Sequence, residues 1–440
     1  MINHISIFFI FLILILPISL ITGPAIPDLT ITFSGIFFLF FIFYKNVYKN
    51  IFSEKIFIFS IIFWIYLNFI SFYAENMELS FRDSIIFFRI LLIPIFLYFW
   101  IFNNSQTLEK IVTVVFFTVI FVSLDSLYQF IRYDPEFGFG KDIFGFEPGW
   151  YGRLNGPFYK ELIPGAYVSK FGLIGLIFLF MRIKNIFYQQ ILSILYLTLI
   201  GIVTFASGER MALATFLLGI FFLIIFYNKK RAIFIYSLFL IIIVNMLIFK
   251  SHSIYNDYKI LESTPYHLGL KVEKTFDCKK DKNQKCKKII NLQPTFTKII
   301  MNFDDSAYGQ IYNLGWKIFL DHKFFGAGLN NFTHLCNNDD RYKNKLKNFD
   351  CVSHPHNIYL QWLAECGLIG LIFFIAYLVL IIGFILKNNY NRFSLISLST
   401  IIILFWPIMS TGSLLKNWNG ISSFFIIGIC LSLSKLKQKT

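Results

Sequence analysis

The sequence predicts an all-helical protein that crosses a membrane many times, with about twelve transmembrane helices. Its 440 residues are 56% hydrophobic and 20% aromatic, and only 15% are charged, whereas soluble domains are roughly 45–50% apolar and about 25% charged. Twelve apolar runs approach the roughly 20 residues that a membrane-crossing helix needs. This composition excludes a disordered chain, a disulfide mini-protein and an ordinary cytosolic enzyme.

The predicted spans follow the apolar runs in chain order, and the second and the last of them are short or polar-edged. They are Ile5–Ile21, Pro27–Tyr44, Ile56–Tyr73, Ile85–Phe102, Ile111–Ile131, Leu162–Met181, Phe187–Ala206, Met211–Tyr227, Ala232–Phe249, Cys366–Leu386, Phe393–Thr411 and Gly420–Leu433. The first run has no basic segment before it and no small-residue cleavage site, so we expect a retained span and not a cleaved signal peptide.

Lys and Arg in the short loops predict the orientation, because cytoplasmic loops are enriched in these residues. With the N-terminus inside, the inside loops and the C-terminal tail hold Lys45, Lys49, Lys55, Lys110, Arg182, Lys184, Lys229, Lys230, Arg231, Lys387, Arg392, Lys435, Lys437 and Lys439. The short outside loops hold only Arg82, Arg210 and Lys416. Both termini are therefore expected in the cytoplasm. This topology accounts for much of the net charge of +15 without a nucleic-acid partner.

The predicted chain has two long outside segments, and the longer one separates the first nine spans from the last three. Residues 1–249 hold nine spans and the loop 132–161, residues 250–355 form a large loop, and residues 356–440 hold three spans. Within the large loop, Tyr308–Asp321 is helix-like, and the basic run Lys279 to Lys288 indicates an exposed hairpin. Loops of this length are usually functional or disordered. We expect a small folded lid that is mostly helical.

Four of the six cysteines lie in the large loop, at Cys278, Cys286, Cys336 and Cys351. An even number of cysteines in one translocated segment indicates disulfides in an oxidising compartment. Proximity favours the pairs Cys278–Cys286 and Cys336–Cys351, although four cysteines allow three connectivities. The spacings do not fit a zinc site.

The densest polar signal is Ser353-His354-Pro355-His356-Asn357-Ile358-Tyr359, at the outer boundary where a helix begins. A neutral imidazole can take a proton from an attacking hydroxyl, which makes a histidine here a candidate general base. The histidines could instead cap the helix or lie at headgroup level, and a zinc site would need a third ligand that is not evident. Ten residues separate His356 from Gly367.

Two further motifs place arginines at the outer boundary. Ser207-Gly208-Glu209-Arg210 fills a very short loop between two spans, and a guanidinium is well suited to gripping a diphosphate. Gly149 to Phe158 is a rigid turn rich in Gly and Pro that carries Arg153. The simpler interpretations are a surface ion pair at a span end and an interfacial loop. Asp125 and Arg89, near span ends, are expected to pair between helices or to snorkel.

These motifs resemble those of the O-antigen ligase and O-antigen polymerase superfamily. The resemblance rests on His354 through Gly370, Trp316 through Phe332, Arg153 through Phe158 and Ser207 through Arg210, and most strongly on the spacing from His356 to Gly367. It implies an all-helical membrane fold and a metal-independent glycosyltransferase, with no cofactor, that acts on the periplasmic face of a bacterial inner membrane. Such enzymes take a glycan from an undecaprenyl-diphosphate carrier.

The acceptor differs among the members of this superfamily. Ligases transfer the glycan to lipid A–core in lipopolysaccharide biosynthesis, polymerases extend another carrier-linked polysaccharide repeat, and relatives glycosylate proteins. The resemblance implies His356 as the catalytic base and Arg210 as the diphosphate clamp, and it implies donor or glycan contacts by Arg153, Glu209 and His354. Many members have another Arg before the tryptophan, where this sequence has none between Tyr308 and Tyr312. Arg153, Lys317 or Arg341 would have to substitute.

The chemistry agrees with the residues, because a sugar diphosphate is already activated and needs a base, an oriented hydroxyl and cations for the leaving group. With one base and no evident second nucleophile, we expect direct displacement with inversion. The spacing from His356 to Gly367 and the compact lid favour a ligase over a polymerase. The alternatives from other classes are a scaffold and a lipid-linked glycan transporter. Transport would predict charges near the bilayer midplane and inverted repeats, and the sequence has no visible repeat.

Overall fold

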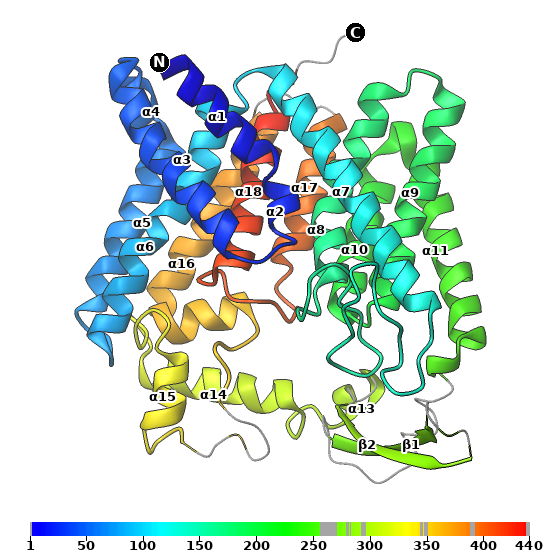
Figure 1. Ribbon diagram of the computed structural model, residues 1–440. Helices are drawn as coiled ribbons and strands as arrows, with labels where there is room; N and C mark the ends of the chain where they lie inside the picture. The colour runs from blue at the N-terminus through cyan, green and yellow to red at the C-terminus, as the bar shows by residue number, and fades with distance from the viewer. Residues whose placement is uncertain are drawn as a thin grey trace. The chain divides into compact units, whose positions relative to one another are not determined.

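The computed structural model describes residues 2–255, 271–278, 281, 283–291, 296–343, 346, 351–387 and 392–436. These residues are predominantly helical and include one antiparallel β-hairpin, as Figure 1 shows. The chain forms two compact units, of which the first comprises Met1–Ile111 and Ala307–Thr440 and the second Val112–Ser306.

The first unit is built around α18, in which every residue from Asn419 to Leu433 is buried. It packs against α3, α6, α16 and α17, and its C-terminal end lies at the same end of this unit as the start of α1 (Figure 1). The elements are α1 (Ile2–Leu14), α2 (Leu16–Ser19), α3 (Ala25–Tyr44), α4 (Tyr48–Phe52), α5 (Lys55–Ser71), α6 (Met77–Phe96), the π-helical η1 (Leu97–Ile101), α14 (Ala307–Asp321), α15 (Phe332–Asn338), α16 (Ile358–Lys387), α17 (Arg392–Phe405) and α18 (Asn417–Leu433).

The second unit is a group of helices with a hairpin at one end (Figure 1). Helix α8 packs against α9 and α10, and α9 packs in turn against α11. The elements are α7 (Ser105–Ile131), which begins in the first unit, α8 (Pro164–Arg182), α9 (Ile186–Ala206), α10 (Arg210–Phe226), the 3-10 helix η2 (Asn228–Lys230), α11 (Arg231–Ser251), β1 (Lys271–Asp277), β2 (Lys285–Asn291) and α13 (Phe296–Met301).

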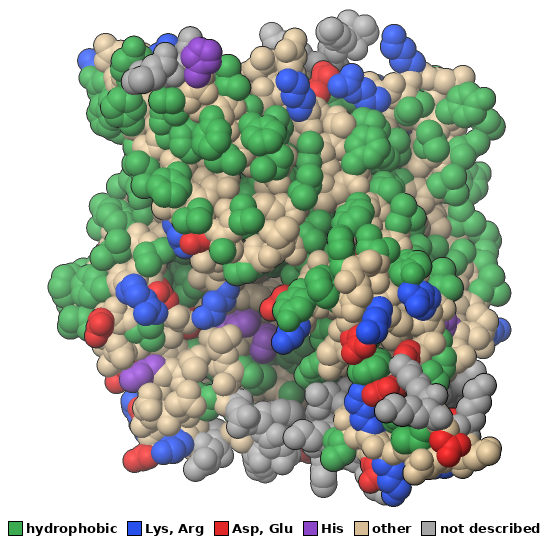
Figure 2. Space-filling view, in the orientation of Figure 1, with side chains coloured by type: hydrophobic (Ala, Val, Ile, Leu, Met, Phe, Trp, Pro, Cys, Tyr) green, Lys and Arg blue, Asp and Glu red, His purple; other side chains and the backbone are tan. Residues whose placement is uncertain are grey.

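A helix occupies each of the twelve predicted spans. In the described part of the chain, seven helices are long and apolar enough to cross a membrane, and five shorter apolar helices occupy the other five positions. The many apolar helices agree with a predominantly helical, multi-pass membrane protein, while the number of crossings stays a prediction. On the face in Figure 2, hydrophobic side chains cover the outer surfaces of the helices, and charged side chains gather near the helix ends. Apolar surface of this kind suits contact with lipid chains.

Several helices begin or end at other residues than the predicted apolar runs. Helix α17 ends at Phe405 and not at Thr411, and Pro407 follows closely, as is usual where a helix cannot continue. Helix α6 starts at Met77, eight residues before the predicted Ile85, because the side chain of Asn76 caps its N-terminus. Helix α16 starts at Ile358 instead of Cys366.

The large loop divides between the two units. Residues up to Ser306 belong to the second unit and residues from Ala307 onward to the first. The predicted hairpin is present as β1 and β2, which pair from Lys271 with Asn291 to Asp277 with Lys285. Lys279, Lys280 and Lys282 of the predicted basic run lie outside the described residues, as do Lys437 and Lys439 of the tail. The predicted helix Tyr308–Asp321 is α14.

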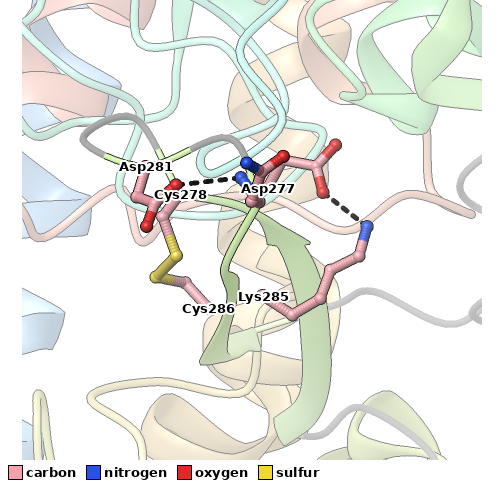
Figure 3. The surroundings of a disulfide bond; sticks show 6 residues. Asp277, Cys278, Asp281, Lys285 and Cys286 are labelled. Atoms are coloured by element: carbon pink, nitrogen blue, oxygen red, sulfur yellow. Dashed lines mark hydrogen bonds and ion pairs between the residues drawn. A yellow bond between two sulfur atoms is a disulfide. The ribbon is translucent and has the colours of Figure 1, made fainter.

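Both expected disulfides are present. Cys278 pairs with Cys286 with a Cα–Cα distance of 5.4 Å, and Cys336 pairs with Cys351 at 5.8 Å. Figure 3 shows the first disulfide at the turn of the hairpin, beside the ion pair of Lys285 with Asp277. The other two cysteines, Cys366 and Cys430, are free and buried.

Replacing Cys336 and Cys351 together by Ser is expected to destabilise the first unit. Their bond closes a chain separation of 15 residues, and Cys336 lies in the apolar core formed by α14 and α15. A loop of this length predicts a loss of about 3 kcal/mol in the free energy of unfolding. Thermal unfolding of the detergent-purified protein tests this, with reduced wild type as the control. Equal midpoints for the oxidised wild type and the double variant would contradict the expectation.

Candidate functional site

The histidine motif forms a tight turn before α16. His356 has a φ of 55°, a left-handed conformation that is uncommon for a residue with a side chain and often marks a functional site. The next residue, Asn357, holds the turn in place. Its Oδ1 accepts the N–H of Leu360 at 2.9 Å, and its Nδ2 donates to the carbonyl of Pro407 at 2.8 Å. The turn is thereby attached to residues 406–416, called here the α17–α18 connection.

Thr411 of the α17–α18 connection anchors both histidines. Its N–H donates to the carbonyl of His356 at 2.7 Å, and its own carbonyl lies 3.2 Å from Nε2 of His354. The two imidazole rings are 4.3 Å apart between centroids. The histidines are therefore a pair with a common backbone support.

His354 is neutral and has both ring nitrogens engaged. Burial, together with the neighbouring His356 and Lys416, lowers the pKa of His354 to about 3 against the opposing effect of the Thr411 carbonyl. Because a carbonyl only accepts, Nε2 must carry the hydrogen, and Nδ1 then accepts from the Ser353 hydroxyl at 2.8 Å. His354 is thus suited to supporting its neighbour.

His356 is the histidine suited to accept a proton. Burial lowers the pKa of His356, and the Thr411 carbonyl again partly opposes the shift. The ring is half-buried, and Tyr308 of α14 approaches it edge-on at 6.0 Å between centroids. An imidazole that turns its N–H towards a carbonyl presents an unprotonated nitrogen on its other side, which is the arrangement of an oriented general base.

Helix α16 changes direction at Gly367, whose φ is 71° and ψ is −173°. Residues 324–328 lie against this kink, and their backbone N–H groups donate to the carbonyls of Ala364 and Glu365, at 2.9 Å each. A Cβ on Gly367 would lie 2.2 Å from the carbonyl oxygen of Phe324. The kink therefore requires glycine both for its dihedral angles and for space.

The spacing from His356 to Gly367 has a structural reason. Residues 358–366 form a short helix between the histidine turn and the kink. Its first end is attached to the α17–α18 connection and its second end to residues 324–328. A residue added or removed here would rotate one attached end relative to the other by about 100°, since a helix has 3.6 residues per turn.

In the second unit, Glu209 caps a neighbouring helix. Its carboxylate accepts the N–H of Gly165 at 2.7 Å and that of Ala166 at 3.1 Å, at the start of α8. Burial raises the pKa of Glu209 to about 7, against the opposing effects of Arg153, the two N–H groups and Lys170. A carboxylate is favourable at a helix N-terminus. Its engagement there gives Glu209 a clear role in organising the local structure.

The turn that carries Arg153 is held by Gln129 of α7. Oε1 of Gln129 accepts the N–H of Asn155 at 3.2 Å and that of Gly156 at 3.0 Å. Nε2 of Gln129 donates to Oδ1 of Asn155 at 2.6 Å. This buried amide satisfies the backbone of a turn that has no regular secondary structure.

The structure brings the two predicted arginine motifs together within the second unit. The N–H of Leu154 donates to the carbonyl of Ser207 at 3.3 Å. Arg153 donates from one terminal nitrogen to the carbonyl of Leu162 at 2.9 Å, while its buried Nε has no hydrogen-bond partner among the described residues. Arg210 is the first residue of α10. Two guanidinium groups thus belong to two adjoining turns.

Lys317 and Arg341, two of the three candidate substitutes for the missing arginine, are engaged with other residues. Lys317 donates to the carbonyl of Arg341 at 3.0 Å, and Arg341 forms ion pairs with Asp339 at 2.6 Å and Glu75 at 3.4 Å. These contacts join Lys317 and Arg341 within the loop and attach Arg341 to the segment between α5 and α6.

The two polar residues near span ends are paired. Arg89 forms an ion pair with Asp28 of α3 at 2.7 Å and donates to Asn417 of α18 at 3.0 Å, so the expected pairing between helices is confirmed for Arg89. Asp125 instead accepts the N–H of Ile143 in the loop that follows α7, at 2.9 Å.

Sequence reasoning missed Thr411, Tyr308 and Gln129. Thr411 was assigned to the end of a span, and the available signal was the polar run Ser410-Thr411-Gly412-Ser413 after Pro407. A glutamine within an apolar run was the signal for Gln129. Among the described residues, no group of three or more His, Cys, Asp or Glu side chains is arranged to hold a metal ion.

The comparison with known families agrees with the motifs. The family model described as O-antigen ligase matches residues 194–375, a stretch that includes Ser207 to Arg210, the large loop, both histidines and Gly367. No curated protein shows significant similarity to the chain. Residues 194–375 of this multi-pass membrane protein are therefore similar to the O-antigen ligase family.

Proposed function

We propose that the protein is an O-antigen ligase-like glycosyltransferase. It moves a glycan from an undecaprenyl-diphosphate carrier to a sugar hydroxyl of lipid A–core, on the periplasmic face of a bacterial inner membrane. The observation that carries this proposal is the neutral, backbone-oriented imidazole of His356 within the matched O-antigen ligase domain. The hydroxyl that receives the glycan must lose its proton, so the reaction needs a base of this kind. A loop that only packs against lipid would not need one.

In the proposed reaction, the oxygen of the acceptor hydroxyl attacks the anomeric carbon of the donor sugar. The new carbon–oxygen bond forms as the bond to the diphosphate breaks, and the carrier diphosphate leaves with the bonding electrons. The hydroxyl proton passes to the free ring nitrogen of His356, which later releases it to water. His354 and the Thr411 carbonyl stay fixed and hold the imidazole in the required orientation. A single displacement inverts the anomeric configuration.

Stabilisation of the leaving diphosphate is assigned to the arginines of the second unit. Arg210 is proposed as the main contact, and Arg153, whose Nε has no partner in the described structure, as a second one. Guanidinium groups bind phosphate oxygens through paired N–H donors. Glu209 contributes by holding the turn between α9 and α10 against α8.

The rate of transfer is expected to fall only in acid. His356 accepts a proton in its neutral form, and burial lowers its pKa from the ordinary value of 6.5. The acid limb of kcat should therefore have its midpoint below pH 6.5, with full activity at pH 7. Initial rates between pH 4.5 and 8 test this. A midpoint above pH 7 would show that a group other than the buried His356 controls the rate.

The acceptor is tested by offering three acceptors to the purified, liposome-reconstituted chain. The donor is the lipid-linked glycan pool extracted from the source organism, and the acceptors are its lipid A–core, the carrier-linked repeat and periplasmic protein. A ligase modifies lipid A–core. Extension of the carrier-linked repeat would instead identify a polymerase, and modification of protein an oligosaccharyltransferase. Unchanged rates with EDTA are expected for a metal-independent reaction.

A further inference from the structure

Glu365 is a buried carboxylate for which the proposed reaction has no direct use. Its residue is only 1% exposed, although it lies on the short helix between the histidine turn and the kink. Burying a carboxylate is costly unless it is hydrogen-bonded. Gln361, one turn earlier, donates to Oε2 of Glu365 at 3.0 Å, and the backbone N–H groups of Asn330 and Phe332 also interact with the carboxylate.

The segment that Glu365 binds belongs to the large loop and is itself attached to the helices. The N–H of Leu329 donates to the hydroxyl of Ser80 in α6 at 3.0 Å. The side chain of Asn331 accepts the N–H of Asn76 at 2.8 Å. Residues 328–332 are therefore held in the first unit by Ser80, Asn76 and the backbone carbonyl of Glu365, and they lie beside the carboxylate of Glu365.

Gln361 continues the network towards the histidines. The same Nε2 that donates to Glu365 donates its second hydrogen to Oγ of Ser413 at 2.8 Å. Oγ of Ser413 also accepts the N–H of Leu415 at 3.0 Å. Ser413 is two residues from Thr411, whose backbone holds both His354 and His356.

The kink itself does not require this carboxylate. It is formed by backbone hydrogen bonds to Ala364 and to the carbonyl of Glu365, together with the glycine at position 367. An apolar side chain of similar size would fill the same space without the cost of burying a charge, and such replacements are often neutral or stabilising. The reason for a carboxylate at this position is therefore its interaction with Gln361 on one side and with the loop segment 328–332 on the other.

We propose that Glu365 is a positioning residue for the proposed transfer reaction. Through Gln361 and Ser413 it links the loop segment 328–332 to the α17–α18 connection, and so it sets the position of the Thr411 carbonyl that orients His356. This inference rests on the proposed function, because it assigns Glu365 an effect on the base of that reaction. It assigns no contact between Glu365 and the substrate.

Ser413→Ala and Glu365→Gln test the link at its two ends. Each is expected to lower kcat about tenfold, which corresponds to the loss of one hydrogen bond in orienting the base. The KM for the donor should change by less than about twofold, since the network does not contact it. Thermal midpoints of both variants are measured in parallel, and Ser422→Ala is the matched control. Ser422 is also buried in this unit but donates only within its own helix.

The exchange variant Glu365→Gln/Gln361→Glu provides a rescue. It restores one donor and one acceptor between positions 361 and 365, leaves an acceptor for the loop N–H groups, and lets the Ser413 hydroxyl donate to position 361. We expect kcat to recover to within about threefold of wild type, using the extracted lipid-linked glycan and lipid A–core as substrates.

The outcomes separate this inference from the proposed function. If His356→Ala abolishes transfer while Ser413→Ala and Glu365→Gln keep the wild-type kcat, the function stands and the positioning role is wrong. The role is also wrong if the exchange variant is no more active than Glu365→Gln at equal thermal stability. If His356→Ala transfers glycan at the wild-type rate, the proposed function itself fails.

Discussion

Replacing His356 by Ala is expected to lower kcat for glycan transfer by about 100- to 10,000-fold, the usual contribution of one general base. The acceptor hydroxyl would then have to lose its proton to water, without an oriented neutral imidazole. Donor binding should change little, because the ring nitrogen is proposed to act on the acceptor. Initial rates of product formation by the liposome-reconstituted full chain measure the effect.

Variants of two other histidines distinguish the role of the base from the role of its support. His354→Ala should cause a smaller loss, since His354 supports the pair through its contact with Thr411 but has both ring nitrogens engaged. His334→Ala is the matched control, because this histidine lies on α15 and is hydrogen-bonded to Asn338 on the same helix at 3.2 Å. A rate for His356→Ala above half that of His334→Ala would exclude His356 as the base.

Replacing Gly367 by Ala is expected to destabilise the first unit by about 3 kcal/mol or more. A left-handed conformation costs roughly 1–2 kcal/mol for a residue with a Cβ, and overpacking adds about 1–3 kcal/mol. The new Cβ would lie 2.2 Å from the Phe324 oxygen and 2.6 Å from the nitrogen of Gly326. Thermal unfolding and transfer rates should both report a large loss.

Gly383 offers a control within the same helix. A Cβ placed there has no other atom within 4 Å, so Gly383→Ala should be neutral or should stabilise α16 by about 0.5–1 kcal/mol through its better helix propensity. If Gly367→Ala unfolds at the same temperature as Gly383→Ala, the kink is not held by the contacts described here.

The features that the sequence predicted correctly are those encoded locally. Each of the twelve apolar runs coincides with an apolar helix of the described residues, because each run is long enough to form a helix that is buried or faces lipid. The cysteine pairs are close in the chain, so proximity alone selected the right connectivity. The hairpin between Lys271 and Asn291 was predictable for the same reason, because its two strands are close together in the chain.

The parts of the site that the sequence did not reveal depend on contacts between distant segments. Thr411 reaches His354 across 57 residues, and no periodic pattern marks such a contact. The spacing from His356 to Gly367 was visible as a motif, but its cause is the packing of residues 324–328 against the kink. The division of the large loop at Ser306 was equally hidden, because no change of composition marks it.

The central claim is that this chain forms a covalent glycosidic product, and mass spectrometry tests it most directly. Liposomes containing only the purified protein are given the extracted lipid-linked glycan and lipid A–core, with EDTA and without ATP. The account predicts glycan-bearing lipid A–core and one released carrier diphosphate for each transfer, both lost with His356→Ala. Movement of the intact donor across the bilayer without any covalent product would contradict it and would identify a transporter.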